Sequence, residues 1–142
     1  MNFDSRVVLD TSTLVSALLK PRSVPAQALV CAREFFTLIV SAETRDELAR
    51  VLARDYLERY RTAQDRETFF NEYALMVVEV DITEHVTACR DPKDDKFLSL
   101  AVSGGAAIIV SSDQDLLSMV QYCGIPILGP RAFVDLCAVD EA

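Results

Sequence analysis

Short apolar runs alternate with longer amphipathic segments along the chain. Five of the runs are rich in β-branched residues and predict β-strands, at residues 6–10, 36–40, 77–80, 107–110 and 125–128. The segments between them place apolar residues at helical spacing and predict helices at residues 12–19, 25–34, 41–60, 66–76, 91–103, 113–122 and from 130 onward. The strands are apolar throughout, as in a parallel sheet that is covered on both faces. The pattern predicts an α/β fold, a three-layer sandwich with helices on both sides of a parallel sheet.

Nothing in the sequence divides the chain into separate units. The 142 residues hold no internal repeat, low-complexity tract or linker rich in Pro, Gly and Ser, so we expect a single domain over residues 1–142. No apolar run approaches the roughly 20 residues that cross a bilayer, and the first residues do not resemble a secretory signal. The four cysteines are scattered without a CxxC pair, which favours a cytoplasmic protein with reduced thiols.

The net charge is −8, from 14 basic and 22 acidic residues. This balance argues against attraction of nucleic acid by overall charge, because phosphate binding normally rests on Lys and Arg. It does not exclude an enzyme whose acids hold divalent cations. Nine of the 14 basic residues lie between Arg45 and Lys96, so the sequence allows a basic face on an acidic protein.

Two aspartates closely follow predicted strands. Asp10 comes directly after Val7-Val8-Leu9, and Asp113 follows the run at 107–110 and two serines. Ligand sites of open α/β sheets lie beyond the carboxyl ends of the strands, and carboxylate oxygens suit Mg²⁺ and Mn²⁺. Each aspartate alone could instead begin a helix, as an N-cap or a first-turn acid. Their joint position favours a shared metal site.

The segment from Asp91 to Leu98 carries two further candidate acids. If Asp91 is an N-cap with Pro92 in the first helical position, Asp94 takes the third position of a capping box. Asp95 then lies three residues before Leu98, on the buried side of the helix. An unpaired charge is costly there, and a metal ion would be a suitable partner. We therefore favour Asp95 over Asp94 for the site.

Glu47 and Asp115 each have a structural and a functional interpretation. Glu47 could belong to a capping box that starts at Thr44. If the helix instead begins at Ser41, Glu47 lies in the second turn beside the apolar stripe, and we slightly favour this functional interpretation. Asp115 fits the third helical position after a Ser112 cap, so we treat it as auxiliary.

Four segments together resemble the motifs of PIN-domain nucleases. They are Val8-Leu9-Asp10-Thr11-Ser12, Asp46-Glu47-Leu48, the run from Asp91 to Leu98, and Ser111-Ser112-Asp113-Gln114-Asp115-Leu116-Leu117. Each motif is weak alone, but their order and spacing over residues 6–137 are fairly specific. The most similar subgroup is the toxin components of bacterial toxin–antitoxin pairs.

The resemblance implies a fold, an activity and a set of site residues. The fold is a five-stranded parallel sheet flanked by helices. The activity is endonucleolytic cleavage of RNA, in which Mg²⁺ or Mn²⁺ would activate a water and neutralise charge on the phosphate. The metal-binding acids correspond to Asp10, Glu47, Asp95 and Asp113. The residues that we treat as auxiliary are Ser12, Ser112, Asp94 and Asp115. An antitoxin partner and a homodimer or higher oligomer are also implied.

RNA contacts are expected beside the acids, from the basic residues Arg90, Lys93 and Lys96. Three arginines of the predicted helix at residues 41–60 are further candidates, Arg45, Arg50 and Arg54. Their alternative is a solvated helix face on which they pair with neighbouring acids. We favour that alternative for Arg54 and leave the other two open.

Other functions fit the sequence less well. A non-catalytic PIN-like module that binds RNA or a protein would not need all four acids. A phosphatase of the haloacid-dehalogenase type needs a second acid two residues after the first, where Ser12 stands. A phosphorylated receiver domain needs a Lys before a late Pro, and Ile125-Pro126 offers none. His85 and Cys89 are too few ligands for zinc, so an ordinary histidine is favoured.

Overall fold

The computed structural model describes residues 4–141, and the side chains of residues 4–138. The strands are β1 (Arg6–Leu9), β2 (Thr37–Val40), β3 (Val78–Glu79), β4 (Ala106–Val110), β5 (Gln121–Tyr122) and β6 (Ile125–Leu128). The α-helices are α1 (Thr11–Leu19), α2 (Val24–Phe35), α3 (Ala42–Leu52), α4 (Ala63–Met76), α5 (Asp95–Gly104), α6 (Gln114–Leu117) and α7 (Pro130–Glu141). Two 3-10 helices are η1 (Asp55–Arg59) and η2 (Pro92–Asp94). None of the described helices is both long and apolar enough to span a membrane.

The strands form one sheet in the order β3-β2-β1-β4-β6-β5. The first five strands in this order are parallel, and β5 pairs antiparallel with β6. The predicted α/β fold with helices around a mostly parallel sheet is confirmed. The expected number of five strands is wrong, because the edge strand β5 makes a sixth. Leu9 of β1 pairs in register with Val110 of β4, so the residues that follow these two strands meet at one edge of the sheet.

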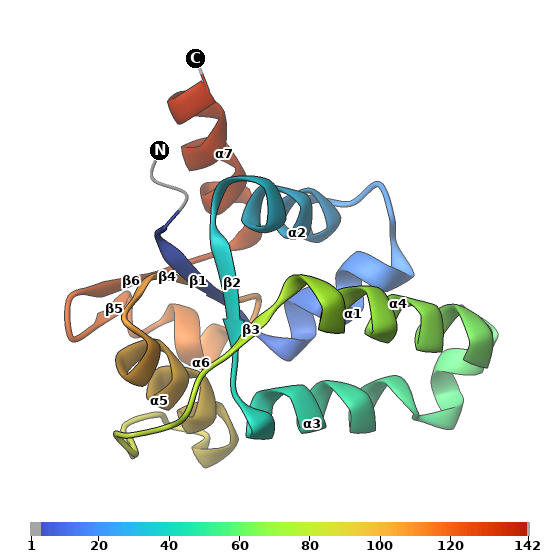
Figure 1. The fold of residues 1–142 in the computed structure, drawn as a ribbon, viewed down its shortest axis with the longest axis horizontal. Coiled ribbons are helices and arrows are strands. Elements are labelled where there is room, and N and C mark those ends of the chain that lie inside the picture. The colour runs from blue at the N-terminus through green and yellow to red at the C-terminus, as the bar shows by residue number, and fades with distance from the viewer. Residues whose placement is uncertain (1–3, 142) are drawn as a thin grey trace.

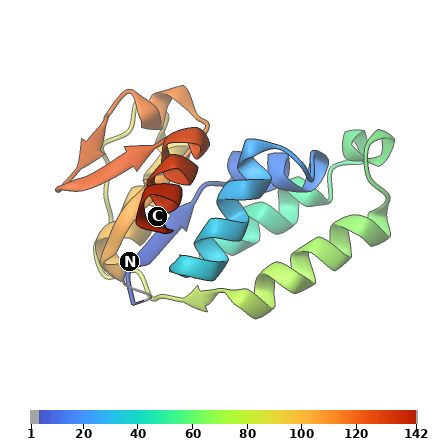
Figure 2. The ribbon, with the colours of Figure 1, turned by 90° about the horizontal axis from the view of Figure 1, so that it is seen from above.

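Helices cover both faces of the sheet (Figures 1 and 2). In Figure 1, α5 and α6 lie to the lower left of the strands, and α1, α3 and α4 lie to the right. Val7 and Leu9 pack in the cluster that includes α1, α2, α3, α4 and α7, whereas Val8 packs with α5 and α6. The side chains of Val7, Val8 and Leu9 are all buried, as this uninterrupted apolar run predicts. A strand that is packed on both sides gives a fixed position to the residue that follows it.

The predicted helix at residues 113–122 is too long. α6 ends at Leu117, and Val120 adopts a φ of 67°, a left-handed conformation that an α-helix does not include. Cys123 and Gly124 also have positive φ, 49° and 79°, as in the tight turns that join antiparallel strands. The chain therefore reverses into β5 and β6 where helical spacing predicts a continuous helix.

The predicted helix at residues 41–60 is divided in two. α3 ends at Leu52 and is followed by η1, whose Leu57 is fully buried. The next helix, α4, begins three residues earlier than predicted, because Thr62 and Asp65 form a capping box. α3, η1 and α4 together extend away from the sheet (Figure 2).

Candidate active site

Asp10 lies at the carboxyl end of β1 and is 3% exposed. It is the N-cap of α1, and its Oδ1 accepts a hydrogen bond from the backbone N–H of Thr13 at 2.9 Å. The Ser12 hydroxyl lies 3.1 Å from both carboxylate oxygens, and the Ser111 hydroxyl donates to Oδ2 at 2.5 Å. Burial raises the pKa of Asp10, while the hydrogen bonds, led by that of Ser111, act to lower it. Asp10 thus caps a helix and is also held in one orientation at the sheet edge.

The segment after β4 brings a second acid to this edge. Ser111 is fully buried, and besides donating to Asp10 it accepts a hydrogen bond from the N–H of Asp113 at 2.9 Å. Asp113 is the N-cap of α6, and its Oδ1 accepts from the N–H of Asp115 at 2.7 Å. Ser112, which we expected to cap this helix, instead lies 3.2 Å from a threonine hydroxyl of α1. One buried serine hydroxyl therefore connects the two strand-end acids.

Glu47 reaches the same region from the second turn of α3. The N-cap of α3 is Ser41, in a capping box with Thr44, so the helix start that places Glu47 beside the apolar stripe is the one that forms. Oε1 of Glu47 accepts a hydrogen bond from the Thr11 hydroxyl at 2.5 Å, and Oε2 makes an ion pair with Nζ of Lys96. Both carboxylate oxygens of Glu47 therefore have partners within the protein.

Asp94 is buried without such a partner. It ends η2 and is 8% exposed, and its Oδ2 has no hydrogen-bond partner among the described residues. Burial and, after it, the negative charges of Asp113, Asp91, Asp10 and Asp115 raise the pKa of Asp94 to about 7. A buried carboxylate among four others is costly unless a proton or a cation neutralises it.

Asp95, which we expected in the site in preference to Asp94, lies elsewhere. Its Oδ1 accepts hydrogen bonds from the N–H groups of Cys89 at 2.8 Å and Ala88 at 3.1 Å, and the bond from Cys89 is the main cause that lowers the pKa of Asp95. The expectation placed Asp95 three residues before the buried Leu98 and Asp94 in a capping box from Asp91, whereas the turn that follows Asp91 is the 3-10 helix η2. A 3-10 helix has about 3.0 residues per turn instead of about 3.6. This tighter winding buries Asp94 in place of Asp95, and no capping box forms.

Asp91, Asp94 and Asp115 form a close group of acids. One carboxylate oxygen of each lies within 4.8 Å of the others, a spacing that a single cation can bridge. Carboxylate oxygens suit hard cations such as Mg²⁺ and Mn²⁺, and the unpartnered Oδ2 of Asp94 is available as a ligand. The residues therefore fit a divalent cation. The sequence indicated Asp91 only as a helix cap and Asp115 only as auxiliary.

Five acids line a cleft of about 660 Å³ between α1, α3 and the segment around η2: Asp10, Glu47, Asp91, Asp94 and Asp113. Its lining residues come from four parts of the chain: Asp10, Thr11, Ser12, Val15 and Ser16; Glu47, Arg50, Val51, Arg54 and Tyr56; Asp91, Lys93, Asp94, Lys96 and Phe97; and Asp113. Neither Asp95 nor Asp115 is among them, although a carboxylate oxygen of Asp115 lies within 4.8 Å of those of Asp91 and Asp94. The topology thus brings Asp10, Glu47 and Asp113 together as the sequence suggested, with Asp94 as the buried acid from the segment around η2.

The basic residues expected to contact RNA differ in their surroundings. The side chain of Lys96 is 9% exposed and is paired with Glu47, so it lies inside the site and not on an open surface. Arg90 is exposed and lies 3.5 Å from Asp115. Lys93 is exposed and lines the cleft. Of the three, Lys93 is the one that presents its charge to the cleft from an exposed position.

The arginines in and just after α3 also separate into two kinds. Arg45 makes an ion pair with an acid of β3. Arg50 and Arg54 are exposed, line the cleft, and make no ion pair within the described part of the chain. The ion pairs that favoured a purely structural role for Arg54 do not form, since Glu58 pairs with Arg66 instead.

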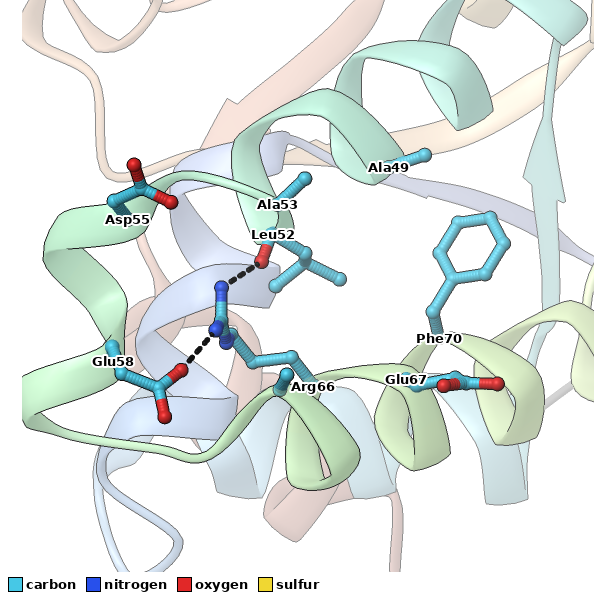
Figure 3. Close-up of a pocket in the computed structure, with 9 residues that line it drawn as sticks. Ala49, Leu52, Ala53, Asp55, Glu58, Arg66, Glu67 and Phe70 are labelled. Carbon is cyan, nitrogen blue, oxygen red and sulfur yellow. Dashed lines mark hydrogen bonds and ion pairs between the residues drawn. The ribbon is translucent and has the colours of Figure 1, made fainter.

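A second hollow, of about 510 Å³, lies between α3, η1 and α4. Figure 3 shows Arg66 reaching across it, with a hydrogen bond to the carbonyl of Leu52 at 2.7 Å and an ion pair with Glu58. Arg66 is 7% exposed and also donates to the carbonyl of Arg54 at 3.2 Å. These bonds tie η1 and α4 to the end of α3. Arg66 therefore supports the segment that carries Arg54 and Tyr56.

Sequence reasoning missed the contributions of Thr11 and Ser111. Thr11 holds Glu47, and Ser111 holds Asp10. Ser111 follows the buried strand β4 as Asp10 follows β1, and this equivalent position is the signal that could have identified it. For Thr11 the sequence carries no comparable signal, because its partner is distant in the chain.

The sequence and fold are similar to those of known proteins. The family described as "PIN domain" matches residues 6–115. The uncharacterised protein MJ1680 of Methanocaldococcus jannaschii is 27% identical over 116 residues, which cover 80% of this chain and 74% of that protein.

Two solved structures share the fold. PAE2754 from Pyrobaculum aerophilum has a TM-score of 0.65 at 13% identity, over 96% of this chain and 98% of that one. VapBC2 from Rickettsia felis, solved bound to a DNA fragment from its promoter, has a TM-score of 0.61 at 11% identity, over 87% of this chain and 98% of that one. At such identities the structures support the fold alone. Since the family match spans most of the sequence, including the acids from Asp10 to Asp115, the chain belongs to the PIN domain family.

Proposed function

We propose that this protein is a metal-dependent endoribonuclease that hydrolyses phosphodiester bonds of RNA at the acidic part of the cleft. Membership of the PIN domain family, whose members are generally nucleases, supports the reaction class. The observation that carries the proposal is the buried, unpartnered Oδ2 of Asp94 among the carboxylates of Asp10, Asp91, Asp113 and Asp115. Such an arrangement is unfavourable for folding and is suited to holding a cation.

The cofactor in this proposal is Mg²⁺ or Mn²⁺. Asp94 would hold it together with Asp91 and Asp115, since one carboxylate oxygen of each lies within 4.8 Å of the others, and Asp10 and Asp113 would add negative charge or further ligands. When bound, the cation supplies positive charge that offsets the negative charge of the phosphate under attack. Glu47 has a positioning role in this proposal, because Lys96 already neutralises its charge.

Other residues act by positioning. The hydroxyls of Ser12 and Ser111 fix the carboxylate of Asp10, and a fixed carboxylate loses less entropy when it binds a ligand. Lys96 places a positive charge in the same cleft, held in position by Glu47. This charge favours the approach of a phosphodiester to a region that otherwise repels it.

A cleavage assay on an end-labelled single-stranded RNA with Mn²⁺ tests the function. Asp10→Asn and Asp94→Asn are each expected to lower the rate by at least about 100-fold, since removal of a metal ligand or its charge abolishes transition-state stabilisation. Asp95→Asn is the matched control. Its new amide oxygen still accepts the two backbone N–H bonds, and it lies outside the cleft, so its rate is expected to stay within about twofold. Full activity of Asp94→Asn, or equal losses at positions 94 and 95 in folded protein, would contradict the proposal.

We further propose that the protein is the cytoplasmic toxin of a toxin–antitoxin pair. Family membership and the fold shared with VapBC2 support this role. Co-expression with the product of the adjacent reading frame tests it: a stable complex in which RNA cleavage is suppressed is the expected result. Light scattering of the complex and of the free protein would report whether the toxin is a homodimer.

One observation favours a second candidate, a PIN-like module that binds RNA or protein without catalysis. Glu47 is neutralised by Lys96, so one acid of the cleft is occupied without any ligand. Binding of RNA by the wild-type protein with no cleavage in Mn²⁺ or Mg²⁺ would support this candidate over the nuclease.

A further inference from the structure

The cleft extends beyond the acids along α3. Arg50 and Arg54 line it, and Tyr56 follows in η1. An α-helix rises about 1.5 Å per residue, so Arg50 lies about 4.5 Å along α3 from Glu47, and Arg54 follows beyond the end of the helix. This separation leaves room for a ligand that contacts the acids and the arginines at the same time.

Arg50 lies in the last turn of α3, and Arg54 follows two residues after the helix ends, just before η1; both line the cleft. Neither makes an ion pair within the described part of the chain, although the protein carries a net charge of −8. Their guanidinium groups present several N–H donors in a plane, which suits the oxygens of a phosphate. Two exposed guanidinium groups in the acidic cleft indicate an anionic ligand.

Tyr56 adds an aromatic surface to the same part of the cleft. Its side chain is exposed, with 56% of the residue accessible, while the next residue, Leu57, is fully buried and anchors η1. Arg66 fixes η1 further, through its ion pair with Glu58 and its hydrogen bonds to carbonyls at the end of α3 (Figure 3). Tyr56 is therefore an exposed ring on a fixed support.

We propose that Arg50, Arg54 and Tyr56 form a nucleotide-binding subsite for single-stranded RNA. One unpaired base stacks on the ring of Tyr56, and the adjoining phosphates contact the two arginines. The inference rests on the proposed function and adds the form of the substrate to it. A base within a duplex has no free face for stacking, so the subsite selects single strands and loops over double-stranded RNA.

The stacking contact is tested by fluorescence anisotropy with a labelled 12-nucleotide oligoadenylate in Mg²⁺, in the Asp10→Asn background to prevent cleavage. Tyr56→Ala is expected to raise Kd about tenfold, within the range that base–aromatic stacking contributes, and Tyr56→Phe to change it less than about twofold. Tyr60→Ala is the matched control, because Tyr60 is also 56% exposed but lies outside the cleft. Unchanged binding by Tyr56→Ala, or an equal loss in Tyr60→Ala, would overturn the inference.

The phosphate contacts are tested by the salt dependence of the same binding. Arg50→Gln and Arg54→Gln are each expected to reduce the slope of log Kd against log salt concentration by about 0.7, the value for one phosphate contact with a single strand. Arg33→Gln, at an exposed arginine of α2 outside the cleft, is expected to leave the slope unchanged. The arginines are not phosphate contacts if both cleft variants keep the wild-type slope.

Two further measurements separate this inference from the proposed function. The duplex form of the same RNA length is expected to bind at least about tenfold more weakly, and equal binding of duplex would overturn the subsite. Cleavage by the wild type that Asp10→Asn loses, together with unaltered binding by Tyr56→Ala, means that the subsite fails and the nuclease stands. Binding that depends on Tyr56 without any cleavage means that the subsite stands and the nuclease fails.

Discussion

The ammonium group of Lys96 is paired with the carboxylate of Glu47 inside the acidic cleft. The two residues come from α5 and α3, which belong to the hydrophobic clusters on opposite faces of the sheet. Thr11 holds the other oxygen of Glu47. The pair therefore joins two layers of the fold and also sets a fixed positive charge among the acids, where it reduces their mutual repulsion.

Replacing Lys96 by Met is expected to destabilise the protein. The side chains of Lys96 and Glu47 are only 9% and 19% exposed, and removing one partner of a largely buried pair leaves the other charge unpaired. We expect a loss of about 1–3 kcal/mol in the free energy of unfolding, measured by urea denaturation, the usual cost of leaving a buried polar group without its partner. Lys93→Met, at the exposed lysine of the same cleft, is the control and should cost less than about 0.5 kcal/mol. Equal stability of the two variants would show that the pair contributes nothing.

Mn²⁺ is expected to raise the melting temperature of the wild-type protein and to raise that of Asp94→Asn much less. An ion that binds only the folded state stabilises it by mass action, by about 2.7 kcal/mol at 100 times its Kd. Asp95→Asn should keep the wild-type shift, because this side chain binds backbone N–H groups outside the cleft. The measurement is thermal unfolding of chelator-treated protein with and without added ion. A shift in Asp94→Asn as large as in the wild type would place the ion elsewhere.

Most of the sheet could be predicted because its central strands are apolar on both faces. Val7, Val8 and Leu9 form an unbroken apolar run that only a doubly covered strand accommodates. The edge strand β5 could not be predicted in this way. It is two residues long, partly exposed, and created by backbone turns at Val120 and Cys123 whose positive φ angles no apolar pattern records.

The acidic cleft was predictable in its parts and not in one decisive detail. Strand ends located Asp10 and Asp113, since parallel strands expose their carboxyl ends at one edge. The choice between Asp94 and Asp95 depended on the winding of a single turn, and adjacent residues differ by about 100° in an α-helix but by about 120° in a 3-10 helix. Periodicity in the sequence does not distinguish the two windings over three residues.

The stability of the metal-free protein is expected to fall as pH rises from about 4 to about 7. Asp94 has a folded-state pKa raised from 3.8 to about 7, so over this range the folded state retains a proton that the unfolded state has lost. Above pH 7 Asp94 is ionised in both states, and the free energy of unfolding has by then fallen by on the order of a few kcal/mol. Asp94→Asn removes this ionisation, and its advantage in stability over the wild type should be larger at pH 8 than at pH 5.

Urea denaturation in the presence of a chelator at the two pH values measures this difference. Asp95→Asn is again the control. Hydrogen bonds lower the pKa of Asp95, so its carboxylate is ionised from pH 5 to pH 8 and the effect of its replacement should be the same at both. A wild type whose stability relative to Asp94→Asn does not change between pH 5 and pH 8 would mean that Asp94 ionises without cost.

Ser111→Ala is expected to weaken both stability and cleavage. The fully buried Ser111 donates to Asp10 and accepts from the N–H of Asp113, so its loss leaves buried polar groups unpaired at a cost of about 1–3 kcal/mol. Its hydrogen bond is the largest influence that lowers the pKa of Asp10, so the remaining carboxylate is both less fixed and more easily protonated. Loss of a residue that orients a ligand typically lowers activity about 10- to 100-fold.

Ser112→Ala, at the exposed neighbour, removes only the contact with Thr13 and should change neither stability nor the cleavage rate much. Urea denaturation and initial cleavage rates in Mn²⁺ compare the two variants, and identical behaviour would show that Ser111 does not position Asp10.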